Sequence, residues 1–177
     1  MSIAEVCRCA DTSKAALYRE FSGEDQLLAE ALGLYYDRVL TPAYQLLEAD
    51  GPAPKVLSTF VDIVMTDRDA AGMPKGCLLT KLRHSQMDAG PKLSRQIQES
   101  EAALITRWQT FVERSIANGT VATDLPSNLL AIYLEAQISL AMWRQSRGCD
   151  DETTREVLQL GLAAILPSAD QHVSLRD

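Results

Sequence analysis

The spacing of apolar residues constrains the fold of this sequence more than any other feature. Along most of the chain they recur at intervals of three and four, the period of an α-helix, and no convincing alternating pattern of a β-strand is present. All seven prolines stand where they can begin, end or kink a helix: positions 42, 52, 54, 74, 91, 126 and 167. The sequence therefore predicts an all-α protein.

The capping and break residues divide this pattern into separate helices. We expect helices at about 2–9, 13–21, 24–40, 54–66, 76–87, 91–118, 127–147 and 151–166. Ser13 can cap the second of these and Ser22 the third, because serine hydroxyls accept hydrogen bonds from free N–H groups of a first turn. Pro42 either kinks or ends the third helix.

The two C-terminal helices are apolar on more sides than a surface helix needs. Residues 127–147 and 151–166 are both rich in leucine, isoleucine and alanine. Such helices are buried in their own core or meet another chain. We favour a homodimer through these two helices, with core burial alone as the alternative.

Composition limits the class of protein. The 177 residues fit one domain, or one domain with a small appendage, and 46% hydrophobic with 23% charged residues is typical of a soluble globular protein. The apolar runs are too short to span a bilayer, and the N-terminus has no leader pattern, so we expect a cytoplasmic protein without a membrane partner. The net charge of −7 argues against nonspecific coating of nucleic acid but leaves room for a small DNA-reading surface.

Catalytic and metal-binding patterns are missing from the sequence. It has no phosphate-binding glycine loop and no G-x-S-x-G motif. The four cysteines (7, 9, 77 and 149) lack the spacing of a disulfide scaffold, and only two histidines accompany them. We therefore expect no enzyme activity, no cofactor and no metal.

The first 21 residues have the layout of a helix-turn-helix. Two short helices are joined by a tight connection at 10–12, and in such a unit the second helix enters the DNA major groove. Small residues at its start would allow close approach to base edges, while Leu17 and Phe21 face inward. The candidate DNA-contacting residues are Ser2, Ser13, Lys14, Ala15, Ala16, Tyr18 and Arg19. An ordinary capped amphipathic helix is the alternative, and capping alone explains Ser2 equally well.

The order of these residues is more specific than their spacing. The stretch SIAEVCRCADTSKAALYREFSGEDQLLAEAL resembles the DNA-binding segment of the TetR family of bacterial transcriptional regulators. GCLLT at 76–80 is similar to a short helix found in one branch of that family, and ANGTVATDLPSNLLA at 117–131 to the lead into its dimerising helix. The resemblance covers essentially the whole chain.

The resemblance implies an architecture and a function. Residues 1–23 would form an incomplete DNA-binding unit, 24–167 a ligand-binding and dimerisation domain, and 168–177 a tail. The protein would be a homodimeric regulator that binds double-stranded operator DNA, most commonly as a repressor released by a small molecule. A dimeric helical protein that binds a ligand or a partner but no longer binds DNA is the rival hypothesis.

The sequence departs from the family pattern in three places. The family's first helix has no counterpart ahead of Ser2, so we expect the natural product to start further upstream. Asp11 stands where the family usually has a turn glycine, and aspartate partly replaces glycine because it tolerates left-handed backbone. Gly23 stands where a lysine often contacts phosphate.

Aromatic, methionine and cysteine side chains in the predicted core are candidates for an effector pocket. An apolar or aromatic small molecule would contact Phe60, Met65, Cys77, Trp108, Phe111, Met142 and Trp143. Plain core packing is the alternative for each of them. Lys81, Arg83 and His84 would suit an anionic ligand, but solvated charge at a helix end is the interpretation we favour for them.

Overall fold

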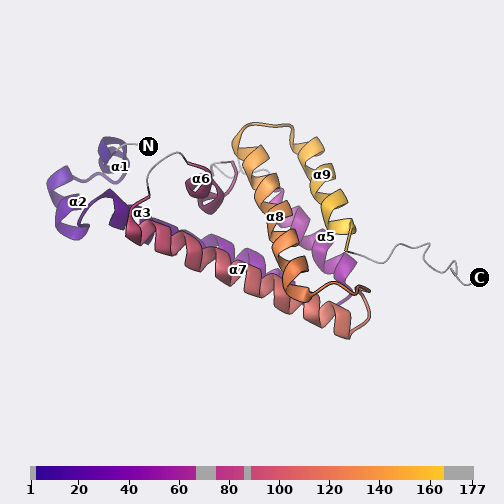
Figure 1. Ribbon diagram of the computed structural model, residues 1–177. Helices are drawn as coiled ribbons and strands as arrows, with labels where there is room; N and C mark the ends of the chain where they lie inside the picture. The colour runs from indigo at the N-terminus through magenta and orange to yellow at the C-terminus, as the bar shows by residue number, and fades with distance from the viewer. Residues whose placement is uncertain (1–2, 67–74, 86–88, 166–177) are drawn as a thin grey trace, which may run out of the picture.

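The computed structural model describes residues 3–66, 75–85 and 89–165, and every regular element within these ranges is helical (Figure 1). The all-α prediction is confirmed. Among the described residues no helix combines the length and the apolar composition needed to cross a bilayer. The helices in chain order are α1 (Ile3–Cys9), α2 (Lys14–Glu20), α3 (Glu24–Tyr35), a π-helical turn (Tyr36–Leu40), α4 (Thr41–Gln45), a 3₁₀ turn (Leu46–Glu48), α5 (Ala53–Val64), α6 (Leu78–His84), α7 (Pro91–Ala117), α8 (Ser127–Ser146) and α9 (Asp151–Ala163).

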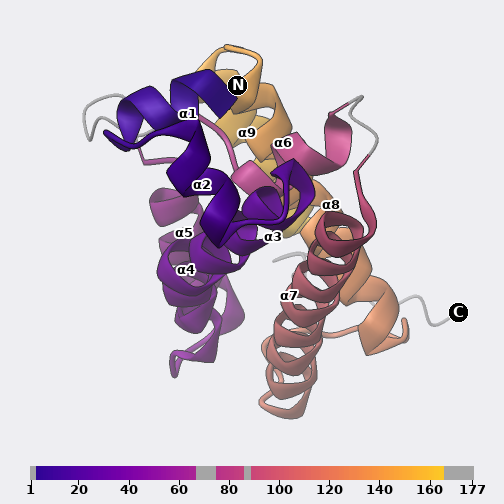
Figure 2. The same ribbon diagram turned by 90° about the vertical axis from the view of Figure 1, so that its left-hand side faces the viewer.

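The arrangement separates a small N-terminal unit from a larger helical body. α1 and α2 lie together at one end of the molecule, and α3 leads away from them along α7 (Figures 1 and 2). α8 lies between α7 and α9 and packs against both. α5 contacts α9. The start of α3 therefore joins the α1–α2 unit to the helical body, and α7 packs against α3.

The third predicted helix continues through Pro42. Helical backbone persists from α3 through the π-helical turn at Tyr36–Leu40 into α4, where Pro42 occupies the first turn. A π-helical turn changes the hydrogen-bond register, and a first-turn proline has no intrahelical N–H bond to lose. Pro42 therefore does not end this helix, and the segment reaches Glu48 before extended backbone begins.

The expected cap of α3 is wrong in detail. Gly23, rather than Ser22, occupies the N-cap position and makes no side-chain cap bond. The Ser22 hydroxyl donates to Gln26 Oε1 at 2.7 Å, and the Ser22 N–H donates to the same atom at 3.1 Å. Gln26 thus reaches back to Ser22 in the manner of a capping box, and this contact occupies the serine.

A cluster of four aromatic rings forms the centre of the body. Tyr44, Phe60, Trp108 and Phe111 make edge-to-face contacts with ring centroids 5.1–6.0 Å apart, and each of them is at most 3% exposed. These rings come from α4, α5 and α7. Edge-to-face packing adds about 1 kcal/mol per pair beyond the burial of apolar area, so this cluster fixes how the three helices meet.

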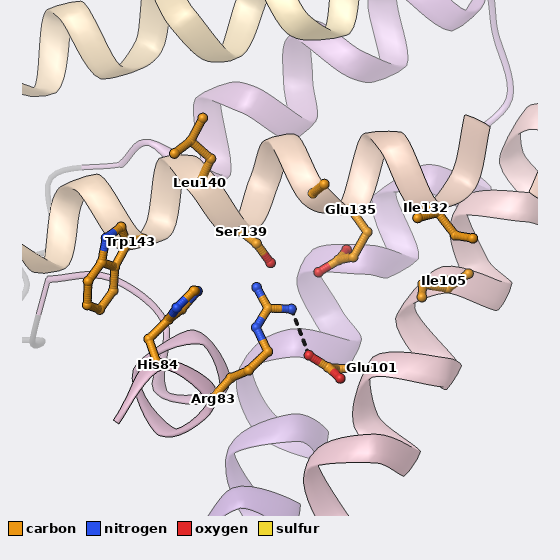
Figure 3. A pocket seen from close by; sticks show the side chains of 10 residues that line it. Arg83, His84, Glu101, Ile105, Ile132, Glu135, Ser139, Leu140 and Trp143 are labelled. Carbon is orange, nitrogen blue, oxygen red and sulfur yellow. Dashed lines mark hydrogen bonds and ion pairs between the residues drawn. The ribbon is translucent and has the colours of Figure 1, made fainter. Parts of the chain in front are cut away.

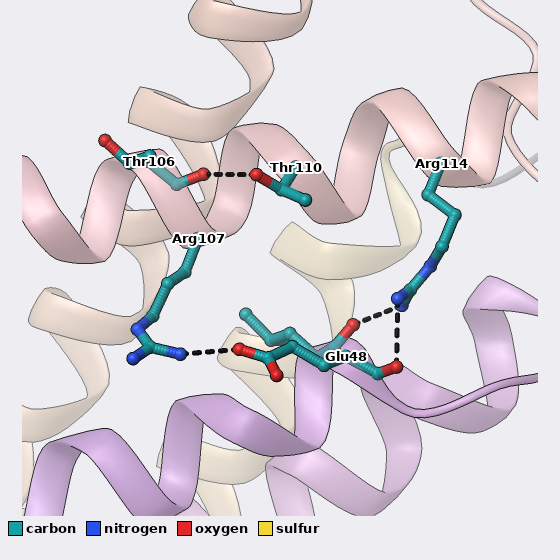
Figure 4. A network of polar contacts seen from close by, with 6 residues as sticks. Glu48, Thr106, Arg107, Thr110 and Arg114 are labelled. Carbon is teal, nitrogen blue, oxygen red and sulfur yellow. Dashed lines mark hydrogen bonds and ion pairs between the residues drawn. The ribbon is translucent and has the colours of Figure 1, made fainter.

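Arginines of α7 hold the end of the α3–α4 segment. Arg107 pairs with the Glu48 carboxylate at 2.7 Å, and Arg114 donates to the backbone carbonyls of Leu47, Glu48 and Ala49 (Figure 4). The last carbonyls of a helix lack partners inside it, and a guanidinium can supply several donors at once. The far end of the segment is therefore tied to α7.

Gly161 of α9 leaves room for the Gln137 side chain of α8. A Cβ added there would lie 2.5 Å from the Gln137 side chain, and the Tyr133 hydroxyl donates to the Gly161 carbonyl at 3.0 Å. Glycine removes the atom that would otherwise keep the two helices apart. The close contact fixes α8 and α9 as one two-helix layer.

This two-helix layer buries only its inner side. Leu130, Leu134 and Ile138 of α8 face the core and are at most 4% exposed. The outer side remains apolar: Leu129, Ile132 and Leu140 of α8 are 43–50% exposed, and Val157 and Leu160 of α9 are 37% and 76% exposed. Burial in the chain's own core therefore accounts for only part of the apolar character of these helices.

Candidate nucleic-acid interface and effector cavity

The turn between α1 and α2 has the backbone that the sequence predicted. Asp11 has a φ of 46°, in the left-handed region, and the following Thr12 N–H donates to the Cys7 carbonyl at 2.9 Å. The Asp11 prediction is confirmed. Aspartate is one of the few side chains that adopts this conformation readily, so the chain can reverse direction within two residues.

The cap of α2 is the predicted one. Ser13 is the N-cap residue, and its hydroxyl oxygen accepts a hydrogen bond from the Ala16 N–H at 3.1 Å. The same hydroxyl still has its own proton to donate. Leu17 is buried on the inner side of the helix, whereas Phe21 is only half-buried, so the expectation that both face inward holds fully for Leu17 alone.

The outer side of α2 is open. Lys14, Ala15 and Arg19 are exposed, Tyr18 is 54% exposed, and Ala16 is half-buried. Within the part of the chain that the structure describes, the side chains of Lys14, Tyr18 and Arg19 make no hydrogen bond or ion pair with another residue. Ser2, the remaining DNA-contact candidate, lies outside the described residues, as does the predicted tail at 168–177.

The start of α3, which follows the α1–α2 unit in the chain, is bonded to the start of α7 through Asp25. The Asp25 carboxylate accepts hydrogen bonds from the backbone N–H groups of Lys92 at 3.1 Å and Leu93 at 2.9 Å. It therefore caps the start of α7, where two N–H groups would otherwise lack partners. Gly90 makes the approach possible, since a Cβ at this position would lie 2.4 Å from Asp25 Cγ.

A cavity of about 350 Å³ lies between α6, α7 and α8 (Figure 3). Its walls combine a charged side, formed by α6 and α7, with an apolar side, formed mainly by α8. The lining residues are Arg83 and His84 of α6, Glu101 and Ile105 of α7, and Ile132, Glu135, Ala136, Ser139, Leu140 and Trp143 of α8. Three of the α8 residues, Ile132, Ala136 and Leu140, are exposed, so the cavity borders the outer apolar side of α8.

Glu135 is the most unusual residue of this cavity. It is 8% exposed, and its Oε2 accepts hydrogen bonds from the Tyr44 hydroxyl at 2.6 Å and from Trp108 Nε1 at 2.9 Å. Burial raises the pKa of Glu135 to about 7, although these two donors act in the opposite direction. Burial beside this carboxylate also raises the pKa of Tyr44 well above its ordinary value. The carboxyl group is therefore close to half ionised at neutral pH.

Glu135 also borders a second, nearly closed space of about 30 Å³. Two residues predicted from the sequence to contact an effector, Cys77 and Met142, line this small space, and Trp143 lines the larger cavity. Phe60, Trp108 and Phe111 are core residues that line neither, and Met65 is buried without lining either one. Of the residues predicted to contact an effector, some therefore line a cavity and others belong to the buried core. That any of them binds a ligand stays a prediction.

Sequence reasoning missed the polar part of the cavity. Glu135 is the only charged residue between Ser127 and Trp143, and this was the available signal. Arg83 and His84, interpreted from the sequence as solvated charge, are exposed but stand on the cavity wall, where Arg83 pairs with Glu101 at 2.7 Å. Among the described residues, no group of three or more His, Cys, Asp or Glu side chains is arranged to hold a metal ion.

Several solved structures with this fold are TetR-family transcriptional regulators. A TetR-family regulator from Agrobacterium tumefaciens superposes with a TM-score of 0.82 at 16% identity, over 94% of this chain and 87% of that one. Escherichia coli NemR in its reduced form superposes with a TM-score of 0.76 at 17% identity, over 93% of this chain and 84% of that one. A cysteine mutant of the TetR-family regulator CifR was solved with 26-bp operator DNA. It superposes with a TM-score of 0.80 at 18% identity, over 92% of this chain and 85% of that one.

The structural match defines the fold class. The chain has the all-helical TetR fold with an N-terminal helix-turn-helix formed by α1 and α2, as the sequence resemblance implied. No protein-family model and no curated protein matches the sequence. In this fold α2 is the second helix of the helix-turn-helix.

Proposed function

We propose that this protein is a homodimeric DNA-binding transcriptional regulator, acting as a repressor that leaves its operator when a small molecule binds. The observation that carries the proposal is the outer side of α2. In a helix-turn-helix this side faces the major groove, and here it presents Lys14, Tyr18 and Arg19 with no partner among the described residues. Lysine and arginine neutralise phosphates or read base edges, and small residues such as Ala15 permit close approach.

The outer side of the α8–α9 layer supports a homodimer. Two adjacent helices here carry exposed apolar side chains, and exposed apolar surface of this kind is typical of protein–protein interfaces. A two-fold pairing would place α8 and α9 of each copy against those of the other, giving a four-helix seam. A dimer also suits DNA, because two recognition helices can then occupy successive major grooves about 34 Å apart.

The cavity supports an effector role because of its position. It touches α6, the middle of α7 and the outer side of α8, which are the elements that connect the proposed dimer seam to the DNA-binding unit. α7 meets the start of α3 through the Asp25 cap. An effector that favours one arrangement of α6 and α7 would shift the spacing of the two recognition helices and so change operator affinity.

Substitution in α2 tests the DNA-binding role. Lys14→Ala and Arg19→Ala should each lower affinity for a duplex from the protein's own promoter region by about tenfold, since each removes a cation from the interface. If both contact phosphate, the double variant should also lower the salt dependence, measured as log affinity against log salt, by about two units. Fluorescence anisotropy at several salt concentrations measures both quantities.

The matched control is Lys55→Ala, which removes an exposed lysine from α5, away from the α1–α2 unit (Figure 1). Its affinity should stay at the wild-type value. If the α2 variants and the control bind equally well, α2 does not contact DNA. If no variant and no wild-type protein binds any duplex, the rival hypothesis of a dimeric helical protein that binds a ligand without DNA is favoured, consistent with the zero net charge of residues 1–21.

A further inference from the structure

We infer that the cavity between α6, α7 and α8 binds a compact arylalkylamine, with its protonated nitrogen at Glu135 and its ring near Trp143. The inference names the ligand class of the effector cavity and therefore rests on the proposed function. Four features of the cavity support this inference. Among the described residues, one oxygen of the Glu135 carboxylate accepts no hydrogen bond, and Glu135 makes no ion pair within the cavity. The end of the cavity near Trp143 is aromatic, and the side walls are apolar.

The first feature is the orientation of the Glu135 carboxylate. Both of its hydrogen bonds, from Tyr44 and from Trp108, reach the same oxygen, Oε2. Oε1 accepts no hydrogen bond from a described residue. Glu135 lines the cavity, and Figure 3 shows its carboxylate on the side where Ser139 and Arg83 lie. Oε1 is not among the buried polar atoms that lack a partner, so it is open to the cavity. A ligand that supplies a charged N–H there would form a charge-assisted hydrogen bond, which is stronger than one between neutral groups.

The second feature is the charge balance. Arg83, the strongest cation of the wall, donates to Glu101 at 2.7 Å, so these two residues largely neutralise each other. Glu135 then remains as the acid without a direct ionic partner. A cationic ligand would complete the pairing of charges in the cavity, whereas an anionic ligand would have to compete with Glu101 for Arg83 and would approach Glu135 as a like charge.

The third feature is the aromatic end. The rings of His84 and Trp143 lie with centroids 4.7 Å apart at a tilt of 34°. Trp143 is eight residues from Glu135 on α8, which corresponds to about 12 Å along the helix axis at 1.5 Å per residue. An aromatic group near Trp143 and an amine at Glu135 thus fit one molecule of fused-ring size with a short linker.

The fourth feature is the side wall and the size of the space. Ile105, Ile132 and Leu140 supply apolar surface between the two ends. A volume of about 350 Å³ lies at the small end of the usual range for small-molecule sites. These dimensions favour a compact amphiphilic amine over a larger drug-like molecule.

Three probes of one shape and different charge test the inference. They are 1-naphthylmethylamine, 1-naphthalenemethanol and 1-naphthoate, titrated into the purified protein by calorimetry at pH 8, where Glu135 is mostly ionised. We expect the amine to bind most tightly. Glu135→Gln should weaken amine binding by about tenfold or more, because a charge-assisted contact is lost, and should leave the alcohol unchanged within about twofold.

Two further variants serve as controls. Glu99→Gln removes an exposed carboxylate of α7 that does not line the cavity, and it should bind all three probes as the wild type does. Trp143→Leu should weaken all three probes together, because it removes the aromatic end and leaves the carboxylate in place. Far-UV circular dichroism of each variant checks that the helices are retained.

The outcomes separate the ligand class from the regulatory role. Equal amine affinity of the wild type and Glu135→Gln, tighter binding of 1-naphthoate than of the amine, or no saturable binding of any probe at millimolar concentration would each overturn the inference. Calorimetry needs no DNA, so amine binding that depends on Glu135 supports the site even if operator affinity does not respond. That last result would count against the proposed effector role alone.

Discussion

Replacing Leu129 and Leu160 together by lysine is expected to turn the proposed dimer into a monomer and to lower operator affinity by about a hundredfold or more. Leu129 is 50% and Leu160 76% exposed on the outer side of the α8–α9 layer, and neither lines the cavity. At a two-fold seam each lysine is buried against apolar side chains of the partner, and an unpaired buried charge costs several kcal/mol. The fold of one chain is preserved because both positions face away from its own core.

The loss of DNA binding follows from the loss of the dimer. Two linked recognition helices bind two half-sites with a high effective concentration, and separate monomers do not have this advantage. Lysine adds positive charge, which by itself would strengthen nonspecific DNA binding. A decrease in affinity therefore cannot be caused by the added charge. Sedimentation velocity measures the oligomeric state, and anisotropy with operator DNA measures affinity.

Ile116→Lys provides the matched control for the seam. Ile116 is 38% exposed in the last turn of α7, so it introduces the same charge on a part of the surface outside α8 and α9. This variant should remain dimeric and should bind DNA as the wild type does. A double variant that sediments as a dimer, or a monomer that keeps wild-type affinity, would show that the outer side of α8 and α9 is not the seam.

The second large effect concerns pH. Glu135 has a pKa of about 7 in the folded protein against an ordinary value of 4.5, so the folded state holds this proton more tightly than the unfolded state does. Its contribution to stability is therefore fully present below pH 4.5 and is lost as pH rises through about 7. The difference of about 2.5 in pKa corresponds to about 3 kcal/mol of unfolding free energy at 1.36 kcal/mol per unit.

Comparison with Glu135→Gln isolates this effect from all other titrating groups. Glutamine resembles the protonated acid and does not titrate, so the stability of the variant relative to the wild type should rise by about 3 kcal/mol between pH 4.5 and pH 8. Urea unfolding of both proteins at several pH values gives the difference. A difference that stays flat over this range would contradict the assigned pKa.

The helices themselves could be predicted from the sequence because their signals are local. The three-and-four spacing, the prolines at 52, 91 and 126 and the Ser13 cap gave α2, α5, α7 and α8 to within two residues at each end. The Asp11 turn followed from the same kind of local preference. The continuation of the helix through Pro42 was harder to predict, because no local residue pattern marks the π-helical turn that precedes it.

The candidate site was harder to predict because it is made of contacts between distant parts of the chain. Glu135 meets Tyr44 across 91 positions and Trp108 across 27, and no local pattern relates these residues. The aromatic residues were correctly recognised as inward-facing, but periodicity cannot distinguish a core ring such as Phe111 from a cavity wall such as Trp143. Only the packing of α6 and α7 against α8 makes that distinction.

Selection of binding sites from a random library of DNA duplexes shows whether the protein reads a DNA sequence through α2. If the protein is a dimeric regulator that reads DNA through α2, selection should enrich a palindrome whose half-site centres lie about one helical turn, roughly 10 bp, or a whole multiple of it apart. The enrichment should disappear when Lys14, Tyr18 and Arg19 are all replaced by alanine. Absence of any enriched sequence with the wild-type protein, or an unchanged palindrome with the triple variant, would contradict the account.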